Sequence, residues 1–249
     1  DLDETLVRVR CEGVHRDGLP RSADFNVRVQ LDSSSSVKED YDCAVAMRPG
    51  LDGFLRWIEE ERDRGRIEGP WIYTTSSPMY TKALLRRLDP GGRIFAMRVL
   101  TRDACCAASM PGFLMKDLHR VPPRDCNTVV RRKVLIDNNP VSHVLNPDSA
   151  VLVRDWLGDN PQDSELDRVR ELLARTLDHR ELQGGDAEAD YVGCIRGTPG
   201  HGDFRRRLKA LQARLSTAAP LEIPALRAEL RAVVAECHDM KEQLLGAAP

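Results

Sequence analysis

Apolar and polar residues alternate in the first fifth of the chain, and this alternation predicts β-strands. The segment ADFNVRVQLD has the two-residue period of a half-buried strand, with apolar residues at Phe25, Val27, Val29 and Leu31. SSSSVKEDYD then has the composition of a flexible loop, and CAVAM (43–47) predicts a returning strand. Together the two strands predict a β-hairpin inserted directly after the first residues.

Three later segments carry apolar residues at helical spacing. RPGLDGFLRWIEEERDRG predicts an amphipathic helix that stops at Gly65, with one apolar face made by Leu51, Phe54, Leu55 and Ile58. A second helix is expected to begin at Ser77, whose hydroxyl can cap it, and to run to Leu88. A third, DSELDRVRELLARTL, has Asp163 as its capping residue and acidic residues in its first turn.

Short apolar runs between these helices predict further strands. They are WIY (71–73), a segment near 94–100, VLI ending on Asp137, and AVLV (150–153). Strands that alternate with helices predict an α/β fold, with a mostly parallel sheet covered on both faces. Ligands of such sheets bind at the carboxyl ends of the strands.

The remainder of the chain is predicted to form a linker and a tail. Residues 181–203 are rich in Gly, Asp and other polar residues, which is typical of a linker. Two amphipathic helices are expected within 204–246. Residues 1–180, ahead of the linker, form the main predicted domain. The apolar stripe of this helical tail has two interpretations, packing against the domain or docking a partner.

Composition narrows the class of protein. The chain has 249 residues, 41% of them hydrophobic and 31% charged, which is typical of a globular protein. No apolar run approaches the roughly 18–20 residues of a transmembrane helix, and a formal charge of −2 gives no reason to expect nucleic-acid binding. The seven cysteines are irregularly spaced without a C-x-x-C pair, which argues against zinc and favours reduced thiols in an intracellular protein.

Polar residues at the predicted strand ends suit phosphoryl transfer. They are Asp1, Asp3, Thr74, Asp137 and Asn138, and Lys116 from MKDL is added to them. Such chemistry needs one carboxylate as nucleophile and a second carboxyl as general acid and then base. It also needs Mg²⁺ on oxygen ligands, and a hydroxyl and an ammonium to hold the phosphoryl oxygens. Each residue alone has an ordinary structural explanation, such as a turn after a strand for IDNN, but the ordered set favours an active site.

DLDETLV, RPGLDGFL, YTTS, KDL and VLIDNNPVSHVLNPDSAV resemble, in this order, the NIF-like branch of the haloacid dehalogenase superfamily. This branch includes the small phosphatases of the RNA polymerase II C-terminal domain and the Dullard-type phosphatases. The resemblance spans about 1–177. It implies a haloacid dehalogenase-like, Rossmannoid parallel sheet, with the hairpin around 25–47 near a substrate groove, and gives no expectation for the tail.

The resemblance also implies roles for the six polar residues. Asp1 corresponds to the phosphorylated nucleophile, and Asp3 to the general acid and base whose backbone carbonyl also binds Mg²⁺. Thr74 and Lys116 correspond to phosphate-binding residues. Asp137 corresponds to the remaining metal ligand, so the implied metal set is Asp1, Asp3 and Asp137. Asn138 beside it is expected to orient the site and bind phosphate.

The implied function is a Mg²⁺-dependent protein serine/threonine phosphatase, nuclear or cytoplasmic, that acts on a phosphoserine or phosphothreonine protein. Two alternatives share the fold: a non-catalytic scaffold like the mitochondrial import relative, and a small-molecule phosphatase. Intact carboxylates argue against the first, and the lack of a segment long enough for a large cap argues against the second. The chain departs from the family at Asn139, where serine is usual, and at His143, where tyrosine is usual. Relatives also have an apolar strand before the first aspartate, so we expect upstream residues to be missing here.

Overall fold

The computed structural model describes residues 1–11, 23–31, 39–107, 114–122, 133–143, 145–146 and 149–182, with scattered residues between 210 and 233. Its contacts divide the chain into two compact units. The first contains 1–104 and 155–171, and the second contains 105–154 and 172–249. Most of the predicted tail lies outside the described residues, so the boundaries at 180 and 203 stay a prediction.

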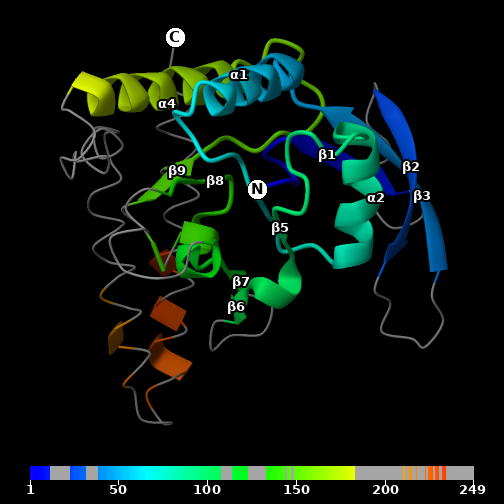
Figure 1. Ribbon diagram of the computed structural model, residues 1–249. Helices are drawn as coiled ribbons and strands as arrows, with labels where there is room; N and C mark the ends of the chain where they lie inside the picture. Colours follow the sequence, from blue (N-terminus) through cyan, green and yellow to red (C-terminus); the bar gives the residue numbers. More distant parts are fainter. Residues whose placement is uncertain are drawn as a thin grey trace. The chain divides into compact units, whose positions relative to one another are not determined.

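The first unit contains a three-stranded antiparallel sheet in the order β1-β3-β2 (Figure 1). Its strands are β1 (Val7–Cys11), β2 (Phe25–Leu31) and β3 (Glu39–Met47). The register places Cys11 directly opposite Cys43, and Phe25 opposite Val45. Strand β1 was not predicted, although its alternation of buried Val7, Val9 and Cys11 with arginines is the same two-residue signal.

A disulfide joins Cys11 of β1 to Cys43 of β3. The prediction that the cysteines are reduced thiols is therefore wrong for this pair. Sequence spacing could not reveal the bond, because it depends on the register of two strands whose cysteines are 32 residues apart. Cys105 and Cys106 are reduced, as predicted.

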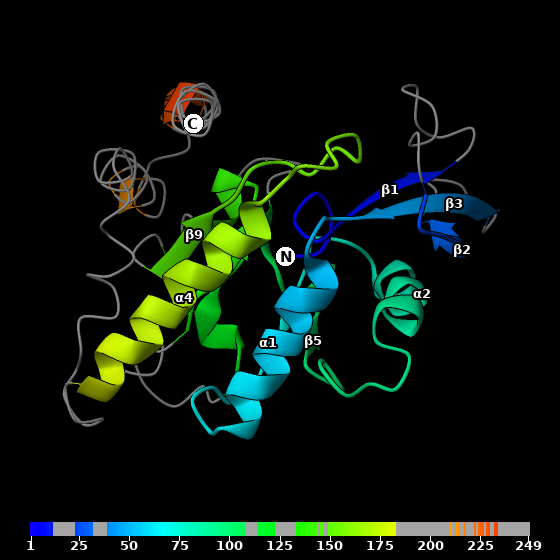
Figure 2. The same cartoon turned by 90° about the horizontal axis from the view of Figure 1, so that it is seen from above.

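The predicted helices of the first unit are present. Helix α1 (Leu51–Asp63) buries the four apolar residues that were expected on one face, and α2 (Pro78–Leu88) begins after Ser77. The Ser77 hydroxyl accepts the backbone N–H of Tyr80, which confirms the predicted cap. Helix α2 packs against β2 (Figures 1 and 2). The Arg87 guanidinium lies over the Phe25 ring.

The first unit also contains two short parallel strands. They are β4 (Ile72–Tyr73) and β5 (Val99–Leu100). The strand predicted near 94–100 is confined to its last two residues. Its first residues form a turn instead, because the backbone N–H groups of Ile94 and Phe95 donate to the Asp89 carboxylate. A 3₁₀ turn, η1 (Arg102–Ala104), follows β5.

The described residues of the second unit form one antiparallel and one parallel strand pair. The antiparallel pair is β6 (Cys106–Ala107) with β7 (Leu114–Met115), and the parallel pair is β8 (Leu135–Asp137) with β9 (Ala150–Leu152). Strand β8 ends on Asp137, as predicted. The 3₁₀ turns are η2 (Leu118–Arg120) and η3 (Pro140–His143).

Helix α4 (Glu165–Leu182) begins in the first unit, two residues after Asp163, and continues in the second. The backbone N–H of Glu165 donates to the Asp163 carboxylate, as expected of a capping residue. The described elements therefore make a mixed α/β protein with parallel strand pairs, and the prediction of a mostly parallel sheet holds only in part. No described helix is long and apolar enough to cross a membrane.

Candidate active site

The two predicted catalytic residues, Asp1 and Asp3, lie in a tight loop ahead of β1. The Leu2 side chain is fully buried, and the Leu2 carbonyl accepts the backbone N–H groups of Leu6 and Val7. The Thr5 hydroxyl donates to the Asp1 carboxylate at 3.2 Å. The loop reverses at Glu4, a non-glycine residue with a φ of 59°. Asp1 and Asp3 are thus presented by one short, internally bonded turn.

A buried arginine ties this loop to two distant parts of the first unit. Arg48, which follows β3, donates from Nη1 to the Thr5 carbonyl at 3.1 Å. Its Nε and Nη2 donate to the two carboxylate oxygens of Asp163 at 2.8 and 2.9 Å. The Arg48 side chain is 0% exposed and that of Asp163 is 8% exposed. A bidentate pair at this depth fixes both partners geometrically, so the loop is held between the end of β3 and the start of α4.

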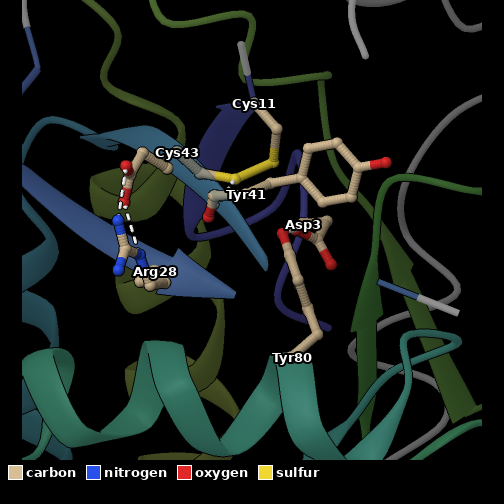
Figure 3. Close-up of a disulfide and its surroundings, with 7 residues drawn as sticks. Asp3, Cys11, Arg28, Tyr41, Cys43 and Tyr80 are labelled. Carbon is tan, nitrogen blue, oxygen red and sulfur yellow. Dashed lines mark hydrogen bonds and ion pairs between the residues drawn. A yellow bond between two sulfur atoms is a disulfide. The ribbon is translucent and has the colours of Figure 1, made fainter. Parts of the chain in front are cut away.

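The Asp3 carboxylate is held by two hydroxyl groups. Ser76 donates from Oγ to Oδ2 of Asp3 at 2.7 Å, and the Tyr80 hydroxyl donates to Oδ1. Figure 3 shows the Tyr80 side chain rising from α2 toward Asp3. Burial, and then the adjacent Asp3 charge, raise the pKa of Tyr80 well above its ordinary value. The tyrosine therefore remains a neutral O–H donor at physiological pH.

Thr74 lies at the end of β4, where the sequence placed it. It is buried, and its backbone N–H donates to the Leu100 carbonyl of β5. Its hydroxyl oxygen accepts the backbone N–H of Ser76 at 3.1 Å. The predicted phosphate-binding threonine thus shapes the loop whose serine contacts Asp3, and the first unit brings Thr74, Ser76 and Asp3 into one network.

The second unit contains the other predicted site residues. Lys116 follows β7, and its ammonium donates to the Asp137 carboxylate at 2.5 Å. Their side chains are 1% and 0% exposed. Burial alone would raise the pKa of Asp137, but nearby positive charge, most of all the Lys116 cation, lowers it below its ordinary value. Asn138, directly after β8, is also buried.

The six predicted residues are thus divided between the units. Asp1, Asp3 and Thr74 belong to the first, and Lys116, Asp137 and Asn138 to the second. Within each unit they lie at strand ends or in the tight loop, and four of them, Asp1, Asp3, Lys116 and Asp137, form hydrogen bonds with buried residues. Their catalytic roles stay predictions.

The oxygen atoms of the predicted metal-binding residues suit a hard cation such as Mg²⁺. Carboxylate and carbonyl oxygens from Asp1, Asp3 and Asp137 match the oxygen ligands that Mg²⁺ prefers. Among the residues that the structure describes, no three His, Cys, Asp or Glu side chains already form a cluster that could hold a metal. A Mg²⁺ site on these residues stays a prediction.

Sequence reasoning missed three residues of the first unit's network, Arg48, Ser76 and Tyr80. Two of them lie inside segments that were singled out for other reasons, RPGLDGFL and YTTS. Ser76 and Tyr80 are four residues apart across the start of α2, a spacing that can direct two hydroxyls to one place. Their common target could not be read from the sequence, because Asp3 is 73 and 77 residues away.

A family model and several known phosphatases are similar to this chain. A family model described as NIF, NLI interacting factor-like phosphatase, matches residues 1–183. Carboxy-terminal domain RNA polymerase II polypeptide A small phosphatase 2 of Mus musculus is 32% identical over 196 residues, which cover 79% of this chain and 60% of that protein. Carboxy-terminal domain RNA polymerase II polypeptide A small phosphatase 1 of Homo sapiens is 34% identical over 166 residues, which cover 67% of this chain and 53% of that protein.

A solved structure, "The Structure of Fcp1, an essential RNA polymerase II CTD phosphatase", has a TM-score of 0.54 at 19% identity. The match covers 78% of this chain and 68% of that one. This likeness shows that the chain shares the fold of that phosphatase, which agrees with the predicted α/β class. The chain spans between 53% and 60% of the length of the two small phosphatases.

Proposed function

Because the chain belongs to the NLI interacting factor-like phosphatase family, we propose that it is a Mg²⁺-dependent protein serine/threonine phosphatase. The reaction proceeds through a phosphorylated aspartate. The observation that carries this proposal is the Asp1–Asp3 loop, in which one carboxylate is bonded by Thr5 and the other by two hydroxyls. Two carboxylates in one rigid turn, each with different partners, suit the separate roles of nucleophile and proton carrier.

In the first half-reaction an Asp1 carboxylate oxygen forms a bond to phosphorus while the bond from phosphorus to the serine or threonine oxygen breaks. Asp3 gives its proton to that leaving oxygen. In the second half-reaction Asp3 removes a proton from water, whose oxygen bonds to phosphorus as the Asp1–phosphorus bond breaks. Inorganic phosphate leaves, and both carboxyl groups return to their initial states.

The remaining predicted residues hold the phosphoryl group and the metal. The Thr74 hydroxyl and the Lys116 ammonium bind the phosphoryl oxygens, with Asn138 beside them. Asp1, the backbone carbonyl of Asp3, and Asp137 would hold Mg²⁺. When bound, this ion offsets the negative charge that the nucleophile and the phosphate bring together. The ion pair between Lys116 and Asp137 supports these roles, because it holds the ammonium and the carboxylate in place.

The substrate class follows from the named relatives. Two of them are named as phosphatases of the RNA polymerase II C-terminal domain, so we place the substrate among phosphoserine and phosphothreonine proteins of that kind. The β2–β3 insertion borders the substrate groove in this proposal, and the tail docks a partner. A nuclear or cytoplasmic location suits such substrates.

The proposal is tested with phosphoserine and phosphothreonine peptides, assayed with Mg²⁺ and with a chelator. Turnover that requires the metal, with an acid-stable, hydroxylamine-labile phosphoryl group on the enzyme, is the expected result. Asp1→Asn should form no phosphoenzyme, because a neutral amide is a far poorer nucleophile than a carboxylate. Phosphopeptide binding without hydrolysis would instead favour the scaffold alternative, and a strong preference for small phosphate esters would favour the small-molecule phosphatase.

A further inference from the structure

We propose that Ser76 and Tyr80 are positioning residues that fix the Asp3 carboxylate in the orientation needed for proton transfer. This inference rests on the proposed function, because it gives Asp3 the role of general acid and base. Neither hydroxyl is assigned to phosphate or metal in the proposed reaction. Both act on the leaving group only through Asp3.

The geometry of the carboxylate carries the proposal. An aspartate side chain has two rotatable bonds, and a hydrogen bond to one oxygen leaves the other free to swing. Here Ser76 Oγ lies 2.7 Å from Oδ2, and the Tyr80 hydroxyl bonds Oδ1. The two donors come from different elements, the loop after β4 and the first turn of α2. Bonds to both oxygens from two directions fix both rotations of the side chain.

Each donor is itself held in place. The backbone N–H of Ser76 bonds the Thr74 hydroxyl, and the Ser76 carbonyl accepts the backbone N–H of Arg102 at 3.0 Å. The backbone N–H of Tyr80 is capped by Ser77, and the Tyr80 side chain is 8% exposed. A proton carrier works best when its neighbours are locked by their own hydrogen bonds and packing. The two hydroxyls meet this condition.

The competing explanation is that the hydroxyls only satisfy a partly buried carboxylate and stabilise the fold. Both explanations predict some loss of stability when a hydroxyl is removed. They differ in chemistry. A positioning role predicts that the loss is large for a leaving group that needs a proton, small for one that does not, and absent once Asp3 can no longer carry a proton.

The experiment measures kcat and KM of Tyr80→Phe and Ser76→Ala on a phosphoserine peptide and on an aryl phosphate with an acidic leaving group. Tyr73→Phe and Thr81→Val are the matched controls. Tyr73 and Thr81 are also buried in the first unit, but their hydroxyls donate to the carbonyls of Ala104 and Ser77. Each substitution is also made in the Asp3→Asn background, and thermal unfolding is recorded for every variant.

Tyr80→Phe and Ser76→Ala should lower kcat on the phosphopeptide by about 10- to 100-fold, the usual cost of a misplaced catalytic group. The KM should change little, and the loss on the aryl phosphate should be several-fold smaller. Ser76→Thr, which keeps the hydroxyl, should recover most of the activity. In the Asp3→Asn background neither hydroxyl deletion should lower the residual rate further, because both act through Asp3.

Equal losses on the two substrates, or losses that persist in the Asp3→Asn background, would overturn the positioning role. Activity of Tyr80→Phe and Ser76→Ala equal to that of the controls would do the same. A crystal structure of the chain carrying both Ser76→Ala and Tyr80→Phe, with the Asp3 carboxylate in an unchanged single orientation, would also contradict it. These outcomes all require an active wild-type chain, whereas a wild type without Mg²⁺-dependent turnover on either substrate refutes the proposed function itself.

Discussion

Two arginine–aspartate pairs of similar geometry differ in burial. We therefore expect that removing the arginine affects the stability of the protein differently in the two pairs. Arg48 bonds Asp163 with two N–H groups at 2.8 and 2.9 Å, and Arg28 bonds Asp42 with two at 3.0 Å (Figure 3). The first pair has side chains 0% and 8% exposed, the second 68% and 66%. Each pair therefore serves as the control for the other.

Arg48→Met should be strongly destabilising. It leaves the Asp163 carboxylate buried without its cation, and it removes the donor that bonds the Thr5 carbonyl. Losing one partner of a buried ion pair costs about 3–5 kcal/mol, a large part of the roughly 5–15 kcal/mol by which domains are stable. At about 2–4 °C per kcal/mol for a chain of this size, the melting temperature should fall by about 6–20 °C.

The assay is equilibrium unfolding in urea, followed by far-ultraviolet circular dichroism, for Arg48→Met, Asp163→Leu and the double variant. The double variant should lose less stability than the sum of the single variants, because it leaves no unpaired charge. Arg28→Met should barely move the midpoint, since an exposed pair gains little over its hydrated charges. A loss below about 1 kcal/mol for Arg48→Met, or an equal loss for Arg28→Met, would refute the reasoning.

Three further predictions concern other features. Cys43→Ser should lower the free energy of unfolding by about 3–4 kcal/mol on the loop-closure model for a 32-residue separation from Cys11; an unchanged melting temperature under both reducing and oxidising conditions would contradict the disulfide. The lowered pKa of Asp137 contributes stability above the ordinary aspartate pKa of about 4, and this contribution is lost as pH falls through the lowered value. Lys116→Met should therefore reduce stability at neutral pH, with the deficit shrinking in acid as measured by urea midpoints; a deficit that grows in acid would show the sign to be wrong. Asp1→Asn should abolish peptide hydrolysis, and measurable turnover above a no-enzyme blank would exclude Asp1 as the nucleophile.

Local signals in the sequence predicted those parts of the fold that local forces determine. The Ser77–Pro78 pair predicted the start of α2, because capping and a fixed proline φ act within one turn. The apolar face of α1 was read from its period, and β8 ends on Asp137 as its apolar run indicated. The placement of Thr74 at the end of β4 followed from the same kind of reasoning.

The parts that were missed depend on contacts between distant segments. The disulfide needs the register of β1 and β3, and the Arg48–Asp163 pair joins residues 115 positions apart. The shortened strand before Leu100 was missed because the Asp89 carboxylate captures backbone N–H groups that a strand would have used. Composition and periodicity describe single segments, so they do not identify such partners.

The span between Arg48 and Asp163 also has a consequence for biosynthesis. A ribosome adds about 5–20 residues per second, so a nascent chain holds Arg48 for roughly 6–23 s before Asp163, 115 residues later, is made. Throughout that interval the guanidinium cannot be buried with its partner, and the loop that carries Asp1 lacks one of its anchors. The β1–β3 pairing, which closes a shorter stretch of chain, can form earlier. The loop therefore reaches its final geometry only after the first turn of α4 has emerged, and any shortened version of the chain that ends before Asp163 leaves that step incomplete.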